Sequence, residues 1–240
     1  MASSSEFPSS DAFAFPCRDD GTPTALSPPV VISVLASILE RHIALNEKAL
    51  LAAGSHDDTA TSDDADDDLA AAAMATRRRA EAFDSGGTEL DMSLREFLDR
   101  FHRYADVSPA VYVVAYAYLD RLRRRGDGGV RVVRANAQRL LTAAILVASK
   151  FVEDRNYKNS HFAAVGGIGA AELGRLELDF LFLMEFRLNV CATVFRSYCR
   201  HLEREVSFAG RYRGRVQKPL VCAGEARPRQ AQHRQAAAAQ

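Results

Sequence analysis

The chain has 240 residues, of which 48% are hydrophobic and 26% are charged, and its 31 basic side chains are balanced by 31 acidic ones. This composition is ordinary for a soluble protein of one or two domains. The four cysteines show no paired spacing and the N-terminus has no basic-then-apolar leader, so we expect no secreted disulfide framework and an intracellular, reducing location.

The N-terminal part combines an irregular start with one helix. Residues 1–26 are rich in Ser, Pro and Asp without an apolar period, which is typical of disorder. Residues 27–52 begin with Ser and Pro in cap and first-turn positions, and apolar residues then recur with helical spacing. We expect an amphipathic helix that later parts of the chain must cover. Its apolar stripe contains Val31, Val34, Leu35, Ile38, Leu39 and Leu45.

A run of negative charge follows this helix. Seven aspartates and no basic residue lie between His56 and Leu69, a pattern typical of a solvated segment. The residues after it, 69–83, are rich in Ala and Arg and either extend this segment or form a frayed helix. We therefore assign residues 53–87 to an acidic, alanine-rich linker.

From residue 88 onward the pattern changes to closely spaced helices. Ser93 and Glu96 make a capping box before the first helix, and Ser108 with Pro109 begins a second one. The apolar run 110–119 in that second helix is about half of the roughly 20 residues that a membrane span needs, so we expect a helix surrounded by others and no membrane segment. Further helices are predicted at about 134–153, 159–165, 170–184 and 193–206.

The predicted fold class is all-α, because no segment shows the period-two pattern of a strand. We expect one five-helix domain within residues 88–206, with an additional N-terminal helix and a C-terminal helix. Both ends of the chain, including the basic tail 207–240, are predicted to be disordered.

The motifs of common catalytic and metal sites are missing. The sequence contains no P-loop, nucleophile elbow, zincin motif or zinc-spaced cysteine pair. Cys191, Cys199 and His201 are typical of core and surface positions on one helix. The glycines at 166–169 lack a preceding strand and a following lysine, so they predict a turn that ends a helix. We expect no catalytic residue, metal or cofactor, and a protein that is not an enzyme.

Two charged residues with apolar neighbours are the most informative. Lys150 follows the run LLTAAILVAS, and Glu177 lies within LGRLELDFLFLM. Burying either charge without a partner would cost on the order of several kcal/mol. They therefore pair with each other, face solvent at a helix edge, or offer charge-assisted hydrogen bonds to a partner protein. The apolar contacts beside such a partner would be Val147, Phe151, Leu181 and Phe186.

Four segments in this region resemble a cyclin box. They are VVAYAYLDRL (113–122), TAAILVASKFVED (142–154), NYKNSHFAAVGGI (156–168) and RLELDFLFLMEFRLNV (175–190), in matching order and spacing. The pattern is most similar to the plant P-type cyclins, also called U-type, which are similar to the phosphate-signalling cyclin of budding yeast.

This resemblance implies a non-catalytic subunit that binds and activates a cyclin-dependent kinase. The expected role is control of the cell cycle and cell division, with a link to nutrient (phosphate) signalling, in the nucleus or cytoplasm. In cyclins, the lysine of the ASKF segment and the glutamate of the fifth box helix bind the kinase near its αC helix. These are Lys150 and Glu177 here, and Val147, Phe151, Leu181 and Phe186 fall where cyclins supply apolar kinase contacts.

The chain departs from cell-cycle cyclins at one further site. It has LREFL (94–98) where they carry a substrate-docking MRAIL segment, and Tyr104 stands about where they place an acidic residue. Phe101 and Gln138 are the positions that would remain in such a docking groove. We expect no second box, because the residues after Val206 are basic and low in apolar side chains, and the resemblance to P-type cyclins implies a single box.

Six arginines and one acidic residue lie between positions 121 and 134. Three interpretations stay open: a solvated loop, a docking site for an acidic substrate or inhibitor through Arg123, Arg124 and Arg125, and a nucleic-acid or scaffold contact that also uses the basic tail. Nucleic acid is the least favoured partner, because no aromatic residues that could stack on bases are interleaved with the arginines.

Overall fold

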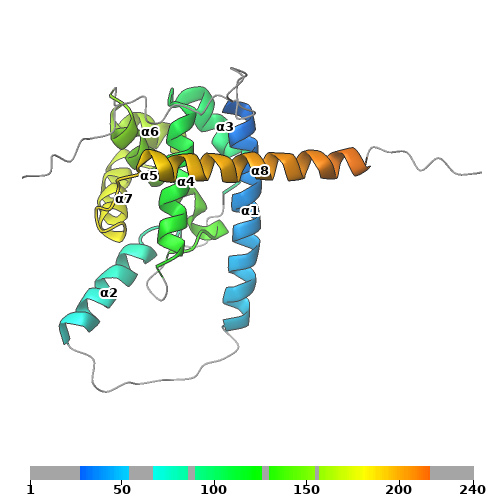
Figure 1. Ribbon diagram of the computed structural model, residues 1–240. Helices are drawn as coiled ribbons and strands as arrows, with labels where there is room; N and C mark the ends of the chain where they lie inside the picture. Colours follow the sequence, from blue (N-terminus) through cyan, green and yellow to red (C-terminus); the bar gives the residue numbers. More distant parts are fainter. Residues whose placement is uncertain (1–27, 54–66, 86–89, 126–129, 155–156, 217–240) are drawn as a thin grey trace, which may run out of the picture.

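The computed structural model describes residues 28–53, 67–85, 90–125, 130–154 and 157–216. These residues form helices and no strand, which confirms the all-α prediction. The disorder predicted for 1–26 and for the end of the tail, 217–240, lies outside the described residues. The helices, labelled in Figure 1, are α1 (Pro28–Ala53), α2 (Asp67–Glu81), α3 (Leu94–Tyr104), α4 (Pro109–Arg123), α5 (Arg134–Val152), α6 (Asn159–Gly166), α7 (Ala170–Leu183) and α8 (Ala192–Val216).

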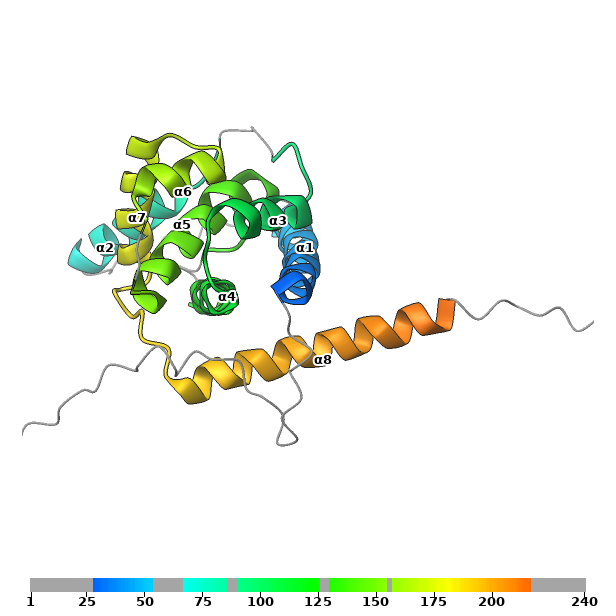
Figure 2. The ribbon, with the colours of Figure 1, turned by 90° about the horizontal axis from the view of Figure 1, so that it is seen from above.

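Helix α5 is the centre of the fold. Its residues 140–149 are all buried, and it packs against α4, α6 and α7. Ala143, Ala144 and Ala148 are completely buried on this helix, and their small side chains let the neighbouring helices approach closely. Figure 2 shows α3, α4, α6 and α7 arranged around it.

Helix α4 is buried along almost its whole length, as its apolar run predicts. Every residue from Ala110 to Asp120 is buried, because α5 lies against one side of the helix and α1 and α8 lie against the other. The run therefore forms the interior of a helical domain. Within the described part of the chain, no helix is long and apolar enough to cross a membrane.

Helix α1 packs along α3, α4 and α8, which supply the cover that its apolar stripe requires. Five of the six predicted stripe residues are buried, but Leu45 is exposed. Figure 1 shows the reason, because α3 and α8 lie against the first half of α1 and do not extend alongside its last turns.

Helix α2 lies within the range 53–87 that we assigned to a linker. It packs on α7, where the Arg79 guanidinium lies 4.4 Å from the centre of the Phe182 ring. Phe83, just after the helix, is completely buried and makes an edge contact with Phe180. The second half of the range therefore belongs to the folded domain. The sequence shows no apolar stripe there because one aromatic side chain provides the anchor.

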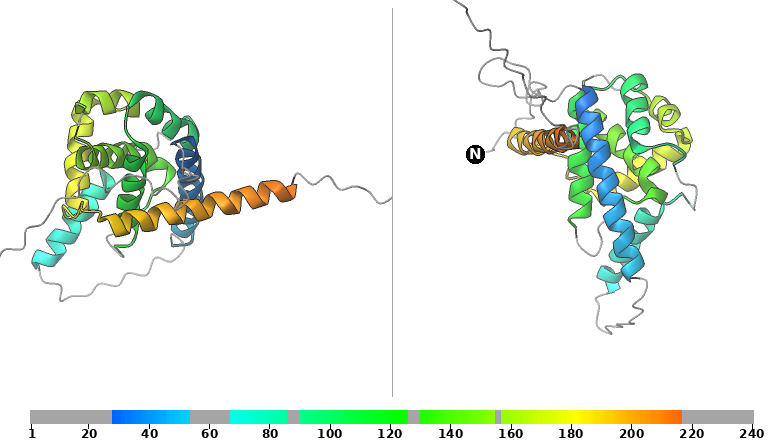
Figure 3. Two further views of the ribbon diagram at one scale, coloured as in Figure 1. Left: turned by 45° about the horizontal axis from the view of Figure 1, so that its top comes forward. Right: turned by 90° about the vertical axis from the view of Figure 1, so that its right-hand side faces the viewer.

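Helix α8 lies across α1 and α4, as Figures 2 and 3 show. Phe195, Cys199 and Leu202 are spaced one turn apart and are completely buried against these helices. The helix then continues to Val216, into the range 207–240 that the sequence predicts to be a disordered tail. Once a docked first half has nucleated a helix, each added residue extends it at low cost.

Candidate functional site

Lys150 and Glu177 form an ion pair between the end of α5 and the middle of α7. The Lys150 Nζ atom lies 2.6 Å from Glu177 Oε1, so of the open alternatives the direct pairing is confirmed. The second oxygen of Glu177 accepts a hydrogen bond of 2.7 Å from the Asn159 side chain. The side chains of Lys150 and Glu177 are 36% and 16% exposed, so the pair lies at the edge of the core.

Asn159 is a member of this site that the sequence analysis missed. It is the first residue of α6, and its amide holds the Glu177 carboxylate from the side opposite Lys150. Its position eighteen residues before Glu177 gives no periodic signal, because the contact depends on how α6 and α7 pack. The carboxylate is therefore fixed by two donors before any partner binds.

Exposed apolar side chains lie on α7, the helix that carries Glu177, and in the turn after it. The buried face of α7 consists of Leu173, Leu176, Phe180 and Leu183. Leu178, Phe182 and Phe186 are exposed, and Leu181 is partly buried. We call Lys150, Glu177, Leu178, Leu181, Phe182 and Phe186 the α5–α7 surface. An exposed apolar group of this kind, bordered by charge, is typical of a protein interaction site.

Leu178 and Phe182 were missed by the sequence analysis, although the pattern contained a signal. Apolar residues occupy most positions of RLELDFLFL, and a helix can turn only one face inward. The surplus apolar residues must then be exposed or covered by a partner.

The chain reverses sharply after α7 and thereby exposes Phe186. Glu185 and Phe186 have φ angles of 50° and 55°, which are strained for residues other than glycine. Hydrogen bonds from their N–H groups to the carbonyls of Phe182 and Leu181 hold this turn. The ring of Phe186 makes an edge contact with Phe182, with 5.3 Å between the centroids. The turn thus extends the apolar part of the α5–α7 surface.

Two predicted apolar contacts lie deeper than expected. Val147 is buried in the free chain, which argues against a large direct contact, and its role in binding a partner stays a prediction. Phe151 is partly buried and packs against the same core. The reason is that α5 is surrounded by other helices until its last turn, where Lys150 is exposed and Phe151 and Val152 are partly exposed.

The docking groove expected around Phe101 and Gln138 is not formed by these residues. Phe101 is completely buried and packs edge-on against Phe97, so it cannot contact a docked substrate. Gln138 donates hydrogen bonds of 2.9 and 3.3 Å to the carbonyls of Gly166 and Gly167. Helix α1 packs on α3, and the apolar residues of the LREFL segment, Leu94, Phe97 and Leu98, are buried.

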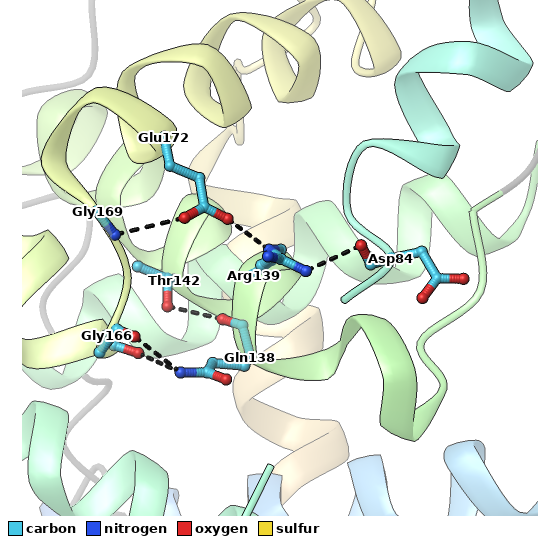
Figure 4. Close-up of polar contacts among 8 residues, drawn as sticks. Asp84, Gln138, Arg139, Thr142, Gly166, Gly169 and Glu172 are labelled. Atoms are coloured by element: carbon cyan, nitrogen blue, oxygen red, sulfur yellow. Dashed lines mark hydrogen bonds and ion pairs between the residues drawn. The ribbon is translucent and has the colours of Figure 1, made fainter. Parts of the chain in front are cut away.

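Gln138 belongs to a polar network that fixes the α6–α7 turn on α5 (Figure 4). Arg139 Nε lies 2.6 Å from Glu172 Oε1, and the same guanidinium donates to the carbonyl of Asp84. Gly167 has a φ of 71° and ends α6 in the left-handed conformation, as the glycine pattern predicts. Asn159 lies on α6 and Glu177 on α7, the two helices that this turn joins.

The three arginines predicted to dock an acidic partner have partners within the chain. Arg123 and Arg124 bind the carboxylate of the buried Asp120, at 2.7 and 2.8 Å. Arg125 donates to the carbonyl of Leu183 and to Glu185. Because these arginines are bound within the chain, the contacts favour neither the interpretation as a solvated loop nor the one as a nucleic-acid binding site. Residues 126–129 of this arginine-rich stretch lie outside the described residues.

Asp120 also accepts a hydrogen bond of 2.9 Å from the Tyr198 hydroxyl, which joins α4 to α8. Burial raises the pKa of Tyr198 to about 12, so this hydroxyl remains a donor. Burial alone would raise the pKa of Asp120. The hydrogen bonds from Arg123 and Tyr198 and the charge of Arg124 outweigh it and lower this pKa.

This lowered pKa predicts a stability loss in acid. A carboxyl with a lower pKa in the folded chain stabilises the fold above its unfolded pKa of 3.8, and the contribution disappears as the pH falls through the folded value. We expect Asp120→Asn to lower the free energy of unfolding by about 2 kcal/mol at pH 7 and to flatten its dependence on pH below 4. Denaturant titrations followed by circular dichroism from pH 7 to pH 3 measure both effects. If the free energies of unfolding of the two proteins vary with pH in parallel, the pH dependence does not come from Asp120.

The described residues hold no cluster of three or more His, Cys, Asp or Glu side chains placed to bind a metal. Cys191 is exposed and Cys199 is buried, where burial raises the pKa of its thiol to about 12. The thiol is thus protonated at neutral pH.

Comparison with known proteins places the site within one family. The family model described as Cyclin matches residues 30–188, a range that includes both Lys150 and Glu177. The chain is 67% identical to Cyclin-P2-1 of Oryza sativa subsp. japonica over 232 residues, which cover 96% of this chain and 95% of the relative. It is 41% identical to Cyclin-U2-1 of Arabidopsis thaliana over 221 residues, which cover 92% and 86% of the two chains.

Proposed function

This chain is a plant P-type or U-type cyclin, and from that premise we propose that it binds and activates a cyclin-dependent protein kinase. Cyclins are regulatory subunits. The observation that carries the proposal is the Lys150–Glu177 pair at the edge of the α5–α7 surface. We extend the proposal to control of cell division, with a link to phosphate supply, in the nucleus or the cytoplasm; this extension rests on the resemblance to P-type cyclins.

The ion pair is organised to bind a partner without further ordering. Glu177 is held by Lys150 and Asn159, and Lys150 keeps two of its three ammonium protons for another acceptor. Charge-assisted hydrogen bonds from such groups are roughly twice as strong as neutral ones. Because the side chains are already fixed, binding loses little conformational entropy.

The exposed apolar side chains of the α5–α7 surface would supply most of the contact area. Phe182 and Phe186 are exposed aromatic rings in mutual contact, and aromatic residues are frequent among the side chains that dominate binding energies. Once a partner covers them, water is excluded from the neighbouring ion pair. Its hydrogen bonds to the partner then become stronger, because the local dielectric constant falls.

Activation would follow from preferential binding to one kinase conformation. A protein kinase needs its β3 lysine paired with the αC glutamate before it can orient ATP. Shifting a kinase from 1% to 99% in this state requires a differential affinity of about 5.5 kcal/mol. In the proposed complex, the charge pair and the aromatic residues of the α5–α7 surface contribute this difference by contacting the αC region only in the active arrangement.

Co-expression with a panel of plant cyclin-dependent kinases tests the function. We expect at least one kinase to co-elute with the full chain in size-exclusion chromatography. We also expect its kcat/KM toward a histone substrate to rise by at least about 100-fold, since the kinase alone is mostly inactive. A panel in which no kinase co-elutes, or in which a bound kinase is not stimulated, would overturn the proposal.

A further inference from the structure

A second candidate site lies at the C-terminal end of α4, outside the α5–α7 surface. A hollow of about 570 Å³ is lined there by the side chains of four arginines from two segments of the chain. Arg121, Arg124 and Arg125 come from the end of α4, and Arg187 comes from the segment after α7. Met184, Glu185 and Asn189 complete the lining.

Positive charge exceeds negative charge around this hollow. The four arginines and the neighbouring Arg123 carry five positive charges, whereas Asp120 and Glu185, the carboxylates that bind them, carry two negative charges. The difference is three positive charges. Such an excess within one hollow favours an anion with more than one negative charge.

Two of the arginines form the framework of the hollow. The terminal nitrogens of Arg121 donate 2.8 Å hydrogen bonds to the main-chain carbonyls of Arg187 and Asn189, so no carboxylate neutralises its charge in these contacts. Arg125 donates to the carbonyl of Leu183 and to Glu185. Together they fasten the segment after α7 to the end of α4.

The other two arginines can reach a ligand. Arg124 binds Asp120 through Nε, which leaves both terminal amino groups for another acceptor, and its side chain is 70% exposed. Arg187 is 82% exposed, and one of its terminal nitrogens lies 3.2 Å from Glu185. Arg121 and Arg125 are held by contacts within the chain, whereas the guanidinium groups of Arg124 and Arg187 are exposed. This combination suits the recognition of a tetrahedral anion.

We propose that this hollow binds a phosphorylated serine or threonine side chain of a partner protein. A phosphate monoester carries about −1.5 to −2 charges at pH 7 and three strong acceptor oxygens, which match paired guanidinium groups better than one carboxylate does. The hollow is larger than a phosphate group, so residues flanking the phosphorylated one also fit, with Met184 as an apolar contact. No aromatic side chain that could stack on a base lines it, which argues against nucleic acid.

The proposed phosphate site borders the α5–α7 surface but does not depend on it. The strained turn at Glu185 and Phe186 separates the exposed ring of Phe186 from Arg187, the next residue. Neither Lys150 nor Glu177 lines the hollow, so binding there can be measured with the chain alone, whatever the outcome of the kinase experiment.

Fluorescence anisotropy with the full chain tests the inference. The probe is a short labelled peptide with one phosphothreonine flanked by Ala and Gly, compared with its unphosphorylated twin. We expect the phosphorylated peptide to bind at least about tenfold more tightly than the twin. The Arg124→Gln, Arg187→Gln double variant should lose this preference. Because Arg124 also binds the buried Asp120, this variant should unfold at a lower temperature, so binding is compared at a temperature at which circular dichroism shows both proteins folded.

The matched control is the Arg95→Gln, Arg103→Gln double variant. These arginines are exposed on α3, which Figure 1 shows at the opposite end of the molecule from the end of α4. This variant has the same net charge as the test variant and should bind the phosphopeptide like the wild type. Equal losses of phosphopeptide affinity in both double variants would overturn the proposal, because the effect would then come from the total charge of the protein.

Two competition experiments decide the ligand class. Inorganic phosphate should displace the peptide only at much higher concentrations; displacement at peptide-like concentrations would assign the site to the free anion and overturn the proposal. A mixed-sequence single-stranded oligonucleotide should bind more weakly than the phosphopeptide. Tighter binding of the oligonucleotide, lost in the Arg124→Gln, Arg187→Gln variant, would also overturn it.

Discussion

Lys150→Gln is expected to lower the affinity of the chain for the cyclin-dependent kinase of the proposed complex by about 2 kcal/mol or more, which is at least about 30-fold. The substitution removes the ammonium group at the edge of the α5–α7 surface and leaves Glu177 with Asn159 as its hydrogen-bond donor. In the complex this carboxylate would be covered by the kinase without its counter-charge. Isothermal titration calorimetry with the kinase that co-elutes with the wild-type chain measures the loss.

Arg139→Gln is the matched control for this experiment. The Arg139–Glu172 pair joins the same two helices, α5 and α7, at the same 2.6 Å distance, and its side chains are 24% and 32% exposed. Both variants lose one ion pair between these helices and should lose similar free energies of unfolding. Only Lys150→Gln should weaken kinase binding. Equal affinity losses would mean that the Lys150 pair merely holds the helices together.

Exchange of the two charges gives an independent check. Lys150→Glu and Glu177→Lys each place like charges side by side, and each should weaken kinase binding. The double variant restores the ion pair between α5 and α7 but presents it to the kinase in reverse order. We expect the double variant to recover stability without recovering affinity. Unchanged affinity in both single variants would remove these residues from the interface.

Gly166→Ala is expected to lower the free energy of unfolding by about 2 kcal/mol, because the added methyl group overpacks a closed site. A Cβ atom on Gly166 would lie 2.6 Å from both the Cγ2 and Oγ1 atoms of Thr142. Thr142 is completely buried on α5, and its hydroxyl donates to the carbonyl of Gln138, so it has little room to move. Urea denaturation of the purified variant measures the loss.

Gly174→Ala supplies the control of opposite sign. Gly174 lies within α7, and a Cβ atom added there would meet no atom within 4 Å. Alanine favours a helix interior over glycine by about 1 kcal/mol, so this variant should be more stable than the wild type. Thr142→Ala in the Gly166→Ala background should recover most of the loss, because it removes both clashing atoms. If Thr142→Ala does not restore stability, a contact other than the clash with Thr142 accounts for the loss in Gly166→Ala.

Local sequence patterns were sufficient for the helices other than α2, and they marked Lys150 and Glu177 as charges that need a partner. The capping box at Ser93 and Glu96 forms as predicted, with the glutamate accepting from the Ser93 N–H at 2.9 Å. The apolar run of α4 is buried, and Gly167 ends α6. These features depend on residues within one or two turns of each other. Lys150 and Glu177 stood out because charges among apolar residues need a partner, and each is the other's partner.

Tertiary packing alone decided which of the remaining side chains reach the surface. Val147 and Phe101 have patterns that also suit an interface, but neighbouring helices bury them. The sequence left three interpretations of the arginine-rich segment open, and only the fold shows that Arg125 binds residues 58 and 60 positions later in the chain.

The sequence by itself thus determined an all-α cyclin with one informative charge pair. The tertiary structure decided what surrounds that pair, added α2 to the domain through Phe83, and gathered four arginines around one hollow. The physical reason is the distance along the chain over which each kind of interaction acts. Helix periodicity and capping involve neighbours along the chain, whereas burial and charge balance depend on residues that only the folded core brings together.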